Sequence, residues 1–426
     1  MNTRKLKAGV GEKTQYLVHE FNDNTIRFVI HYPGFADPEL LCEAVRAVVE
    51  SVDVLHSSFF TDQLRAYWRV NEDYPDTSFF RFVEAEGDPK ATAYSLSLLP
   101  ISPNSETQLC CTLVQGKASS SIVLTMSHLC VDGGDGKYLL NKLVEAYGLL
   151  KNTGSAETLE VKNGSRAAEK IYEKINTREF LSLLKNPISS VKSEFPYPTE
   201  EPGRVRMVSE TIPAAVMEAA RKRAKTQNAT ANDLLLAACY HAYVSLPEID
   251  RLAPVSVMSM MDLRRHCTDG ESEGLCNMSG SLPTTLDDGV PENFADTLTQ
   301  IAAQTNAAKE DPLAGLEGMP LVHGAARTLP MWLLLMISGR VYGSMSIGLT
   351  NLGNVSCESL KLGELTPDGG LFGGPLKKKP AMQVSVISFD GACALTIVGQ
   401  YTETDAASLG KMLRSMVEEI EKYAAE

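Results

Sequence analysis

The stretch SIVLTMSHLCVDGGDGKYLL, Ser121 to Leu140, decides the fold. Its apolar run up to Ser127 predicts a strand, and the leucines after the glycine-rich turn recur at helical spacing. Between strand and helix stand His128 and Asp132, with Asp135 placed to cap the helix. Catalytic and binding groups often lie where a strand leaves its sheet. The stretch therefore predicts either a functional histidine or a capped turn in which the histidine only satisfies a neighbour.

The composition is that of a globular protein, with 44% apolar and 22% charged residues among 426. A single hydrophobic core rarely exceeds about 250–300 residues, so we expect two lobes. Acidic residues outnumber basic ones by 53 to 40, which argues against a nucleic-acid partner. The N-terminus has no apolar segment, no run is long enough to span a bilayer, and the nine cysteines read as reduced thiols. We expect a cytoplasmic monomer without a membrane span.

Both halves of the chain alternate strands with amphipathic helices, which predicts an α/β (α+β) protein with mixed sheets. The firmest helix is residues 38–52, which follow Asp37 and begin with proline. Residues 14–35 read as strands. A proline-rich stretch at residues 193–206 has the composition of a linker, so we place an N-terminal lobe at 1–195 and a C-terminal lobe at 196–426.

Several common catalytic motifs are absent. The chain has no Gly-x-Ser-x-Gly elbow and no Gly-x-Gly-x-x-Gly before a helix, and Val131 and Tyr138 break a phosphate-loop pattern around Gly136-Lys137. An acidic loop with one imidazole is a poor metal site, so we expect no metal. A neutral histidine suits removal of a proton from an alcohol or amine that attacks an acyl thioester directly.

At this point the residues resemble a known group of proteins. His128 to Gly133 match the His-x-x-x-Asp-Gly motif of the chloramphenicol-acetyltransferase-like superfamily, which includes condensation domains and alcohol acetyltransferases. Four further stretches resemble this family in the same order: residues 54–59, 230–238, 261–265 and 350–353. The resemblance therefore covers nearly the whole chain.

The resemblance implies two lobes that meet in a V, with an active-site tunnel between them. His128 is then the general base, and Asp132 is held by Arg264 from the second lobe. Gly133 completes this catalytic set by letting the loop backbone approach the acyl group. The implied substrate-binding residues are Ser127, Thr350 and Asn351, with Asn351 as a donor to the oxyanion.

Two features qualify the resemblance. Peptide-forming condensation domains usually carry two consecutive histidines, and Ser127 stands in the first place, which favours a free-standing O- or N-acyltransferase. The run Lys377-Lys378-Lys379 is either a contact for a CoA phosphate or an acidic carrier protein, or a solvated loop.

The predicted function is transfer of an acyl group from a CoA or carrier-protein thioester to a hydroxyl or amine of a small molecule. The thioester is a co-substrate, and no bound cofactor is expected. The alternative is an inactive condensation-like binding or scaffold protein of secondary metabolism. A weaker third hypothesis is a metal-dependent hydrolase that uses the acidic loop.

Overall fold

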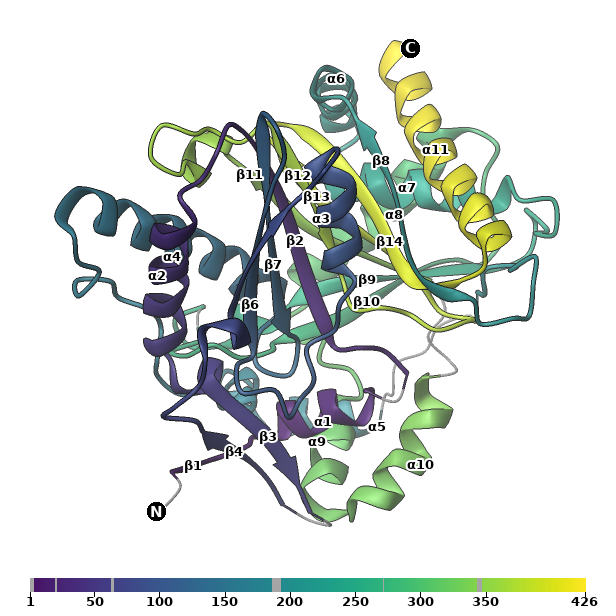
Figure 1. The fold of residues 1–426 in the computed structure, drawn as a ribbon. Coiled ribbons are helices and arrows are strands. Elements are labelled where there is room, and N and C mark those ends of the chain that lie inside the picture. The colour runs from purple at the N-terminus through teal and green to yellow at the C-terminus, as the bar shows by residue number, and fades with distance from the viewer. Residues whose placement is uncertain (1–3, 20, 63–64, 186–192, 271, 343–346) are drawn as a thin grey trace.

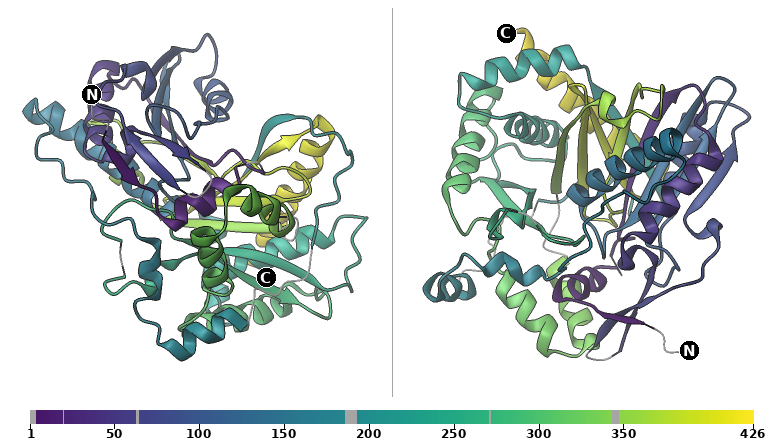
Figure 2. Two further views of the ribbon diagram at one scale, coloured as in Figure 1. Left: turned by 90° about the horizontal axis from the view of Figure 1, so that it is seen from below. Right: turned by 90° about the vertical axis from the view of Figure 1, so that its left-hand side faces the viewer.

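The computed structural model describes residues 4–19, 21–62, 65–185, 193–270, 272–342 and 347–426 (Figure 1). Two mixed sheets covered by helices form two lobes, which confirms the predicted α/β class. In the left view of Figure 2 most of the purple-to-blue part of the chain lies at the upper left, and most of the green-to-yellow part lies at the lower right.

The first lobe is built on a five-stranded sheet in the order β12-β2-β7-β6-β5. Its strands are β12 (Gly369–Gly373), β2 (Thr25–Pro33), β7 (Ser119–Ser127), β6 (Leu109–Gln115) and β5 (Phe80–Glu84). Only β5 and β6 pair in parallel. The central strand β7 ends at Ser127, so His128 leaves the sheet where the sequence predicted.

Helices cover both faces of this sheet. They are α2 (Pro38–Glu50), α3 (Pro89–Ser97) and α4 (Gly133–Thr153). α2 and α4 pack against each other on one face, and α3 packs on the other (Figure 1). Asp37 caps α2 by accepting two backbone N–H groups, as predicted. α4 approaches β2 closely at Gly136, where a Cβ would come within 2.7 Å of the Phe28 ring.

The second lobe is built on a six-stranded sheet in the order β10-β9-β11-β13-β14-β8. Its strands are β10 (Ser279–Leu286), β9 (Val255–Asp262), β11 (Ile347–Val355), β13 (Met382–Phe389), β14 (Ala392–Tyr401) and β8 (Arg204–Ile212). β11 runs parallel to both of its neighbours, and the other pairs are antiparallel.

Four helices pack together over one face of the second sheet: α6 (Ala214–Lys225), α7 (Ala231–Val244), α8 (Phe294–Glu310) and α11 (Glu403–Ala425). Every residue of α7 from Asp233 to Val244 is buried. A helix enclosed on all sides needs no polar face, which explains why its sequence is mostly apolar. Its buried Asp233 and His241 have hydrogen-bond partners in Thr305 and Thr297 of α8.

A smaller layer lies at the bottom of Figure 1. It contains a three-stranded sheet of β1 (Lys5–Lys7), β4 (Ala66–Val70) and β3 (Ser57–Thr61), and the helices α1 (Val10–Leu17), α5 (Thr177–Lys185), α9 (Met319–Thr328) and α10 (Met331–Tyr342). Short 3-10 helices are η1 (Asp53–His56), η2 (Asp76–Ser78), η3 (Ala168–Tyr172), η4 (Leu263–His266) and η5 (Cys357–Leu360). α1 packs against α9 and α10, so a segment near the N-terminus meets two helices from the second half of the chain.

The strand predicted around Tyr16 is wrong, because this segment belongs to α1. Val10 and Leu17, seven residues apart, lie on the same side of that helix. Val10 packs with Ala326 of α9, and Leu17 packs with Met331 of α10. Contacts with helices from the far end of the sequence thus override the local preference for strand.

β12 is a crossover between the two lobes. Although it comes late in the chain, it pairs with β2 and completes the first sheet. The chain then returns through residues 374–381 to β13 of the second sheet. In the described part of the chain, no helix is both long enough and apolar enough to cross a membrane.

Candidate active site

His128 occupies the first turn after β7. Its backbone N–H donates to the carbonyl oxygen of Asn24 at 2.7 Å, and its ring Nδ1 lies 2.8 Å from the carbonyl oxygen of Val131. Because a carbonyl oxygen can only accept, we assign the ring proton to Nδ1. The lone pair of Nε2 is therefore available as a base.

The surroundings of His128 keep its ring neutral. Burial lowers the pKa of His128 below its ordinary value, and the positive charge of Lys377 adds to this effect. The Val131 carbonyl and Asp132 act in the opposite direction and are outweighed. A lowered pKa means that the unprotonated, basic form predominates at neutral pH.

Asn277 holds the His128 turn from the second lobe, and the sequence analysis missed it. Its Nδ2 donates to the His128 carbonyl oxygen at 2.9 Å and lies 3.2 Å from Nδ1 of the ring. Its Oδ1 accepts the N–H of Ser279 at 3.0 Å, which fixes the orientation of the amide. No local motif marks Asn277, since its role follows only from contact with a residue 149 positions away.

The pairing of Asp132 with Arg264 is present. Nη1 of Arg264 donates to Oδ2 of Asp132 at 2.7 Å, and the same oxygen accepts the N–H of Met278 at 3.0 Å. Both side chains are buried, with 3% of Asp132 and 7% of Arg264 exposed. Removing one partner would leave an uncompensated buried charge, so this pair anchors the histidine loop to the second lobe.

Asp135 was predicted to cap the helix, and that prediction is wrong. The cap is Asp132, whose Oδ1 accepts the N–H of Asp135 at 3.0 Å. Asp135 instead points to the second lobe, where its Oδ2 accepts the N–H of Cys276 at 2.9 Å and lies 3.0 Å from Nη2 of Arg264. Asp132 and Asp135 therefore both bind residues of the second lobe. Their spacing of three residues, which places them on one side of the first helical turn, was the available signal.

Three carboxylates surround the Arg264 guanidinium, because Asp262 also lies 3.1 Å from Nη1. Burial and the neighbouring charge of Asp132 raise the pKa of Asp135. These carboxylates are engaged by Arg264 and by backbone N–H groups. Within the described residues, no three histidine, cysteine, aspartate or glutamate side chains gather as metal ligands.

Gly133 makes a close contact with the second half of the chain, and its approach to an acyl group stays a prediction. A Cβ at this position would lie 2.4 Å from Cδ2 of Leu352, so the missing side chain seats a residue of β11. One turn further along α4, Nζ of Lys137 donates to the Leu352 carbonyl oxygen at 2.7 Å. The close backbone approach thus serves the contact between the lobes.

The predicted substrate-binding residues lie in two environments. Ser127 is only 1% exposed, and its hydroxyl has no partner among the described residues, so it lies beneath the site. Asn351 of β11 accepts the N–H of Gly353 at 2.9 Å, and its amide lies 3.5 Å from Oδ1 of Asn232. Thr350 is half-buried on the same strand. Their contact with substrate stays a prediction.

A cavity of about 90 Å³ reaches Asn277 beside the histidine turn. It lies between α1, α9 and the start of β10, and its lining includes Gln15, Asn277 and His323. The tunnel implied by the family resemblance stays a prediction.

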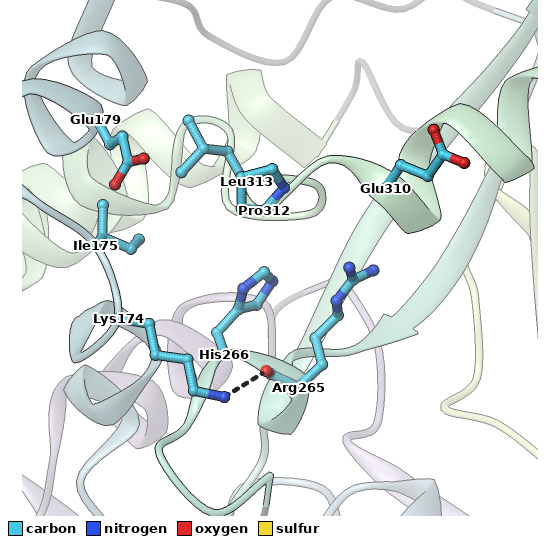
Figure 3. Close-up of a pocket in the computed structure, with 8 residues that line it drawn as sticks. All are labelled: Lys174, Ile175, Glu179, Arg265, His266, Glu310, Pro312 and Leu313. Atoms are coloured by element: carbon cyan, nitrogen blue, oxygen red, sulfur yellow. Dashed lines mark hydrogen bonds between the residues drawn. The ribbon is translucent and has the colours of Figure 1, made fainter.

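A larger cavity, of about 300 Å³, lies beyond η4 (Figure 3). The lysine, arginine and histidine side chains that line it bond to backbone carbonyl oxygens of the protein. Lys174 donates to the Arg265 carbonyl oxygen at 3.1 Å, and Arg265 donates to the Lys309 carbonyl oxygen at 2.9 Å. His266 Nε2 lies 3.0 Å from the Ala314 carbonyl oxygen. These contacts connect η4 to the end of α8. Because η4 contains Arg264, they also help to fix the position of Arg264.

Comparison with known proteins identifies the fold of this chain. No protein-family model and no curated protein matches the sequence. The TRI3 trichothecene 15-O-acetyltransferase from Fusarium sporotrichioides is 13% identical with a TM-score of 0.72, over 98% of this chain and 95% of that chain. The condensation domain from Monacolin K polyketide synthase MokA is 13% identical with a TM-score of 0.70, over 99% and 98%. The epimerization domain from the third module of tyrocidine synthetase B is 16% identical with a TM-score of 0.68, over 99% and 98%.

This chain therefore has the two-lobed fold that condensation domains share with an acetyltransferase, as the sequence motifs predicted. Proteins named for three different reactions have this fold. Because a fold does not set the chemistry, the reaction must be argued from the site itself.

Proposed function

We propose that this protein is an acyltransferase in which Nε2 of His128 is the general base. The observation that carries the proposal is the hydrogen bond from Nδ1 to the Val131 carbonyl, which leaves Nε2 with a free lone pair in a neutral ring. The Asp132–Arg264 pair and Asn277 support it by fixing the turn from the second lobe. Such positioning provides much of the rate in reactions between two bound substrates.

The donor in this proposal is an acyl thioester of CoA or of a carrier protein, and the acceptor is an alcohol or amine. The acceptor gives its O–H or N–H proton to Nε2 while its oxygen or nitrogen attacks the thioester carbonyl carbon. The C–S bond then breaks, and the imidazolium returns the proton to the departing thiolate. The products are an ester or amide and a free thiol, and no covalent bond to the protein forms.

The test is thiol release from a panel of acyl-CoA and acyl-carrier donors with alcohol and amine acceptors. We expect His128→Ala to lose acceptor-dependent release by at least about a hundredfold, the usual contribution of a general base. His56→Gln is the matched control, because His56 Nδ1 contacts the Asn71 carbonyl in the first lobe and a glutamine amide can replace it. A protein-only blank is needed, although eight of the nine cysteines are buried.

Release that persists in His128→Ala would overturn the mechanism. Wild type that binds these donors yet releases no thiol with any acceptor would favour the binding or scaffold protein instead. In an active enzyme the loss of rate at acid pH should begin below about 6.5, the ordinary pKa of histidine, because burial and Lys377 outweigh Asp132 and Asp23 at this ring.

A further inference from the structure

The three consecutive lysines after β12 lie in three different environments. Lys378 is exposed. Lys379 Nζ donates to the carbonyl oxygens of Thr199 at 2.7 Å and Glu201 at 2.8 Å, and it pairs with the buried Asp405 of α11. Lys377 is half-buried, and its positive charge acts on His128. The prediction of a solvated loop is therefore wrong for Lys377 and Lys379, whereas a contact with a CoA phosphate or an acidic carrier protein stays a prediction.

The backbone of Lys377 is fixed. Its N–H donates to the Val398 carbonyl oxygen at 3.2 Å, and its carbonyl oxygen accepts the N–H of Gln400 at 3.2 Å. The preceding residue, Leu376, donates its N–H to Oδ1 of Asp23 at 2.9 Å. Asp23 directly precedes Asn24, whose carbonyl holds the His128 backbone. Lys377 thus lies beside the strand end that carries the proposed base.

The carboxylate of Asp23, whose charge acts on Lys377, is already used by other groups. Oδ1 of Asp23 accepts the N–H groups of Thr25 and Leu376, and Oδ2 pairs with the fully buried Arg27. Arg27 in turn donates to the Gly374 carbonyl oxygen at 2.9 Å, which holds the crossover segment. Asp23 and Arg27 cancel each other, so the ammonium of Lys377 is left as one uncompensated positive charge.

The environment of Lys377 lowers its own pKa, and its charge lowers the pKa of a neighbouring histidine. Burial lowers the pKa of Lys377 to about 8, with Asp23 opposing the shift, and its charge lowers the pKa of His128. No acceptor among the described residues takes a hydrogen bond from Nζ. A cation that is partly withdrawn from water and has no hydrogen-bond partner in the protein favours an anionic ligand, because the charge of the ligand offsets the lost hydration.

We propose that Lys377 is a substrate-recognition residue that binds a carboxylate on the reacting molecule, next to the group that His128 deprotonates. This inference rests on the proposed acyl transfer and names its substrate class. A carboxylate here would balance the charge of Lys377 and accept hydrogen bonds from its ammonium. The phosphates of CoA lie a full pantetheine arm from the thioester, so the anion must belong to the acceptor or to the acyl chain.

The first arm of the test uses 3-hydroxy acids of four to twelve carbons as acceptors, against the matching primary amides. We expect wild type to favour the acid in kcat/KM by at least about tenfold, the size of a charge-assisted hydrogen bond. Lys377→Met should bring the acid-to-amide ratio close to one, and Lys377→Arg should keep part of it. The adjacent Lys378→Met is the control and should keep the wild-type ratio.

The second arm places the carboxylate on the donor, with malonyl-, succinyl- and glutaryl-CoA against butyryl-CoA and a neutral alcohol. A preference that Lys377→Met abolishes in this arm alone would assign the carboxylate to the acyl chain. The same result in the first arm alone would assign it to the acceptor. Either result supports the inference.

A binding measurement separates failure of this inference from failure of the proposed function. Calorimetric titration with the 3-hydroxy acids and acyl-CoAs of both arms needs no turnover. If no thiol is released, tighter binding of the anionic compound to wild type but not to Lys377→Met still supports the subsite. Equal binding of charged and neutral compounds by wild type, or a preference that survives in Lys377→Met, would overturn it.

Discussion

The second half of the chain reaches the His128 turn from two sides, and the two contacts differ in charge balance. On one side three carboxylates surround Arg264, and each of the three guanidinium nitrogens donates to an acceptor. On the other side Lys377 faces Asp23, whose oxygens are taken by other groups. A saturated network fixes geometry, whereas an unsatisfied charge is left for a ligand. Under the proposed function, the comparison therefore separates the residues that hold the His128 turn from Lys377, which we propose to select the substrate.

The largest effect is expected on the saturated side, from Arg264→Met. This change leaves Asp132 and Asp135 buried without their cation, so the free energy of unfolding should fall by about 3–5 kcal/mol. Acyl transfer should fall with it, because the His128 turn loses its anchor. Urea unfolding measures the first effect, and thiol release measures the second.

Arg265→Met is the matched control for this prediction. Arg265 is exposed and donates to carbonyl oxygens at the end of α8, so its loss should cost less than about 1 kcal/mol. Equal losses of unfolding free energy in the two variants would show that the buried network contributes no more than an exposed arginine. That result would contradict the contrast between the two sides.

A smaller effect is expected where the lobes touch at Gly133. Gly133→Ala places a methyl group 2.4 Å from the Leu352 side chain, which should lower the free energy of unfolding by about 1–3 kcal/mol. Gly148, in the same helix, has open space around it, so Gly148→Ala should instead stabilise by about 0.5–1 kcal/mol. Adding Leu352→Ala should restore part of the loss only in Gly133→Ala. A loss in Gly148→Ala as large as that in Gly133→Ala would show that the loss does not come from the contact with Leu352.

The smallest effect is a pH dependence of stability on the Arg264 side. Burial and Asp132 raise the pKa of Asp135, with Arg264, Lys162 and the Cys276 N–H opposing them. The folded state then holds this proton more tightly than the unfolded chain does. The free energy of unfolding should therefore fall as the pH rises from about 4 through the raised pKa.

Asp135→Asn tests this dependence. It should flatten the slope, because the substitution removes the carboxyl group whose pKa is raised. Urea unfolding between about pH 4.5 and 7.5 gives the slope for each variant. Asp262→Asn is the control, because the Asp262 side chain is 59% exposed. An unchanged slope in Asp135→Asn would mean that Asp135 stays ionised beside Arg264.

Much of the fold could be predicted from local patterns. The strand that ends at Ser127, the capped helix that begins at Pro38 and the strand–turn–helix around His128 all depend on neighbours within a few residues. The Asp132–Arg264 contact followed from the family resemblance, since its partners are 132 positions apart. α1 could not be predicted in this way, because its stability comes from helices near residues 319–342.

The sequence by itself determined the two-lobed α/β class, the position of His128 at a strand end and the acidic turn beside it. Only the tertiary structure decided that Asp135 faces the second lobe, that Asn277 grips the histidine turn and that β12 completes the first sheet. Lys377 and Lys379 are two residues apart in one lysine run, yet one lacks a carboxylate of its own and the other has Asp405. Periodicity fixes which residues are apolar or helical, whereas burial and charge pairing depend on atoms brought together from distant parts of the chain.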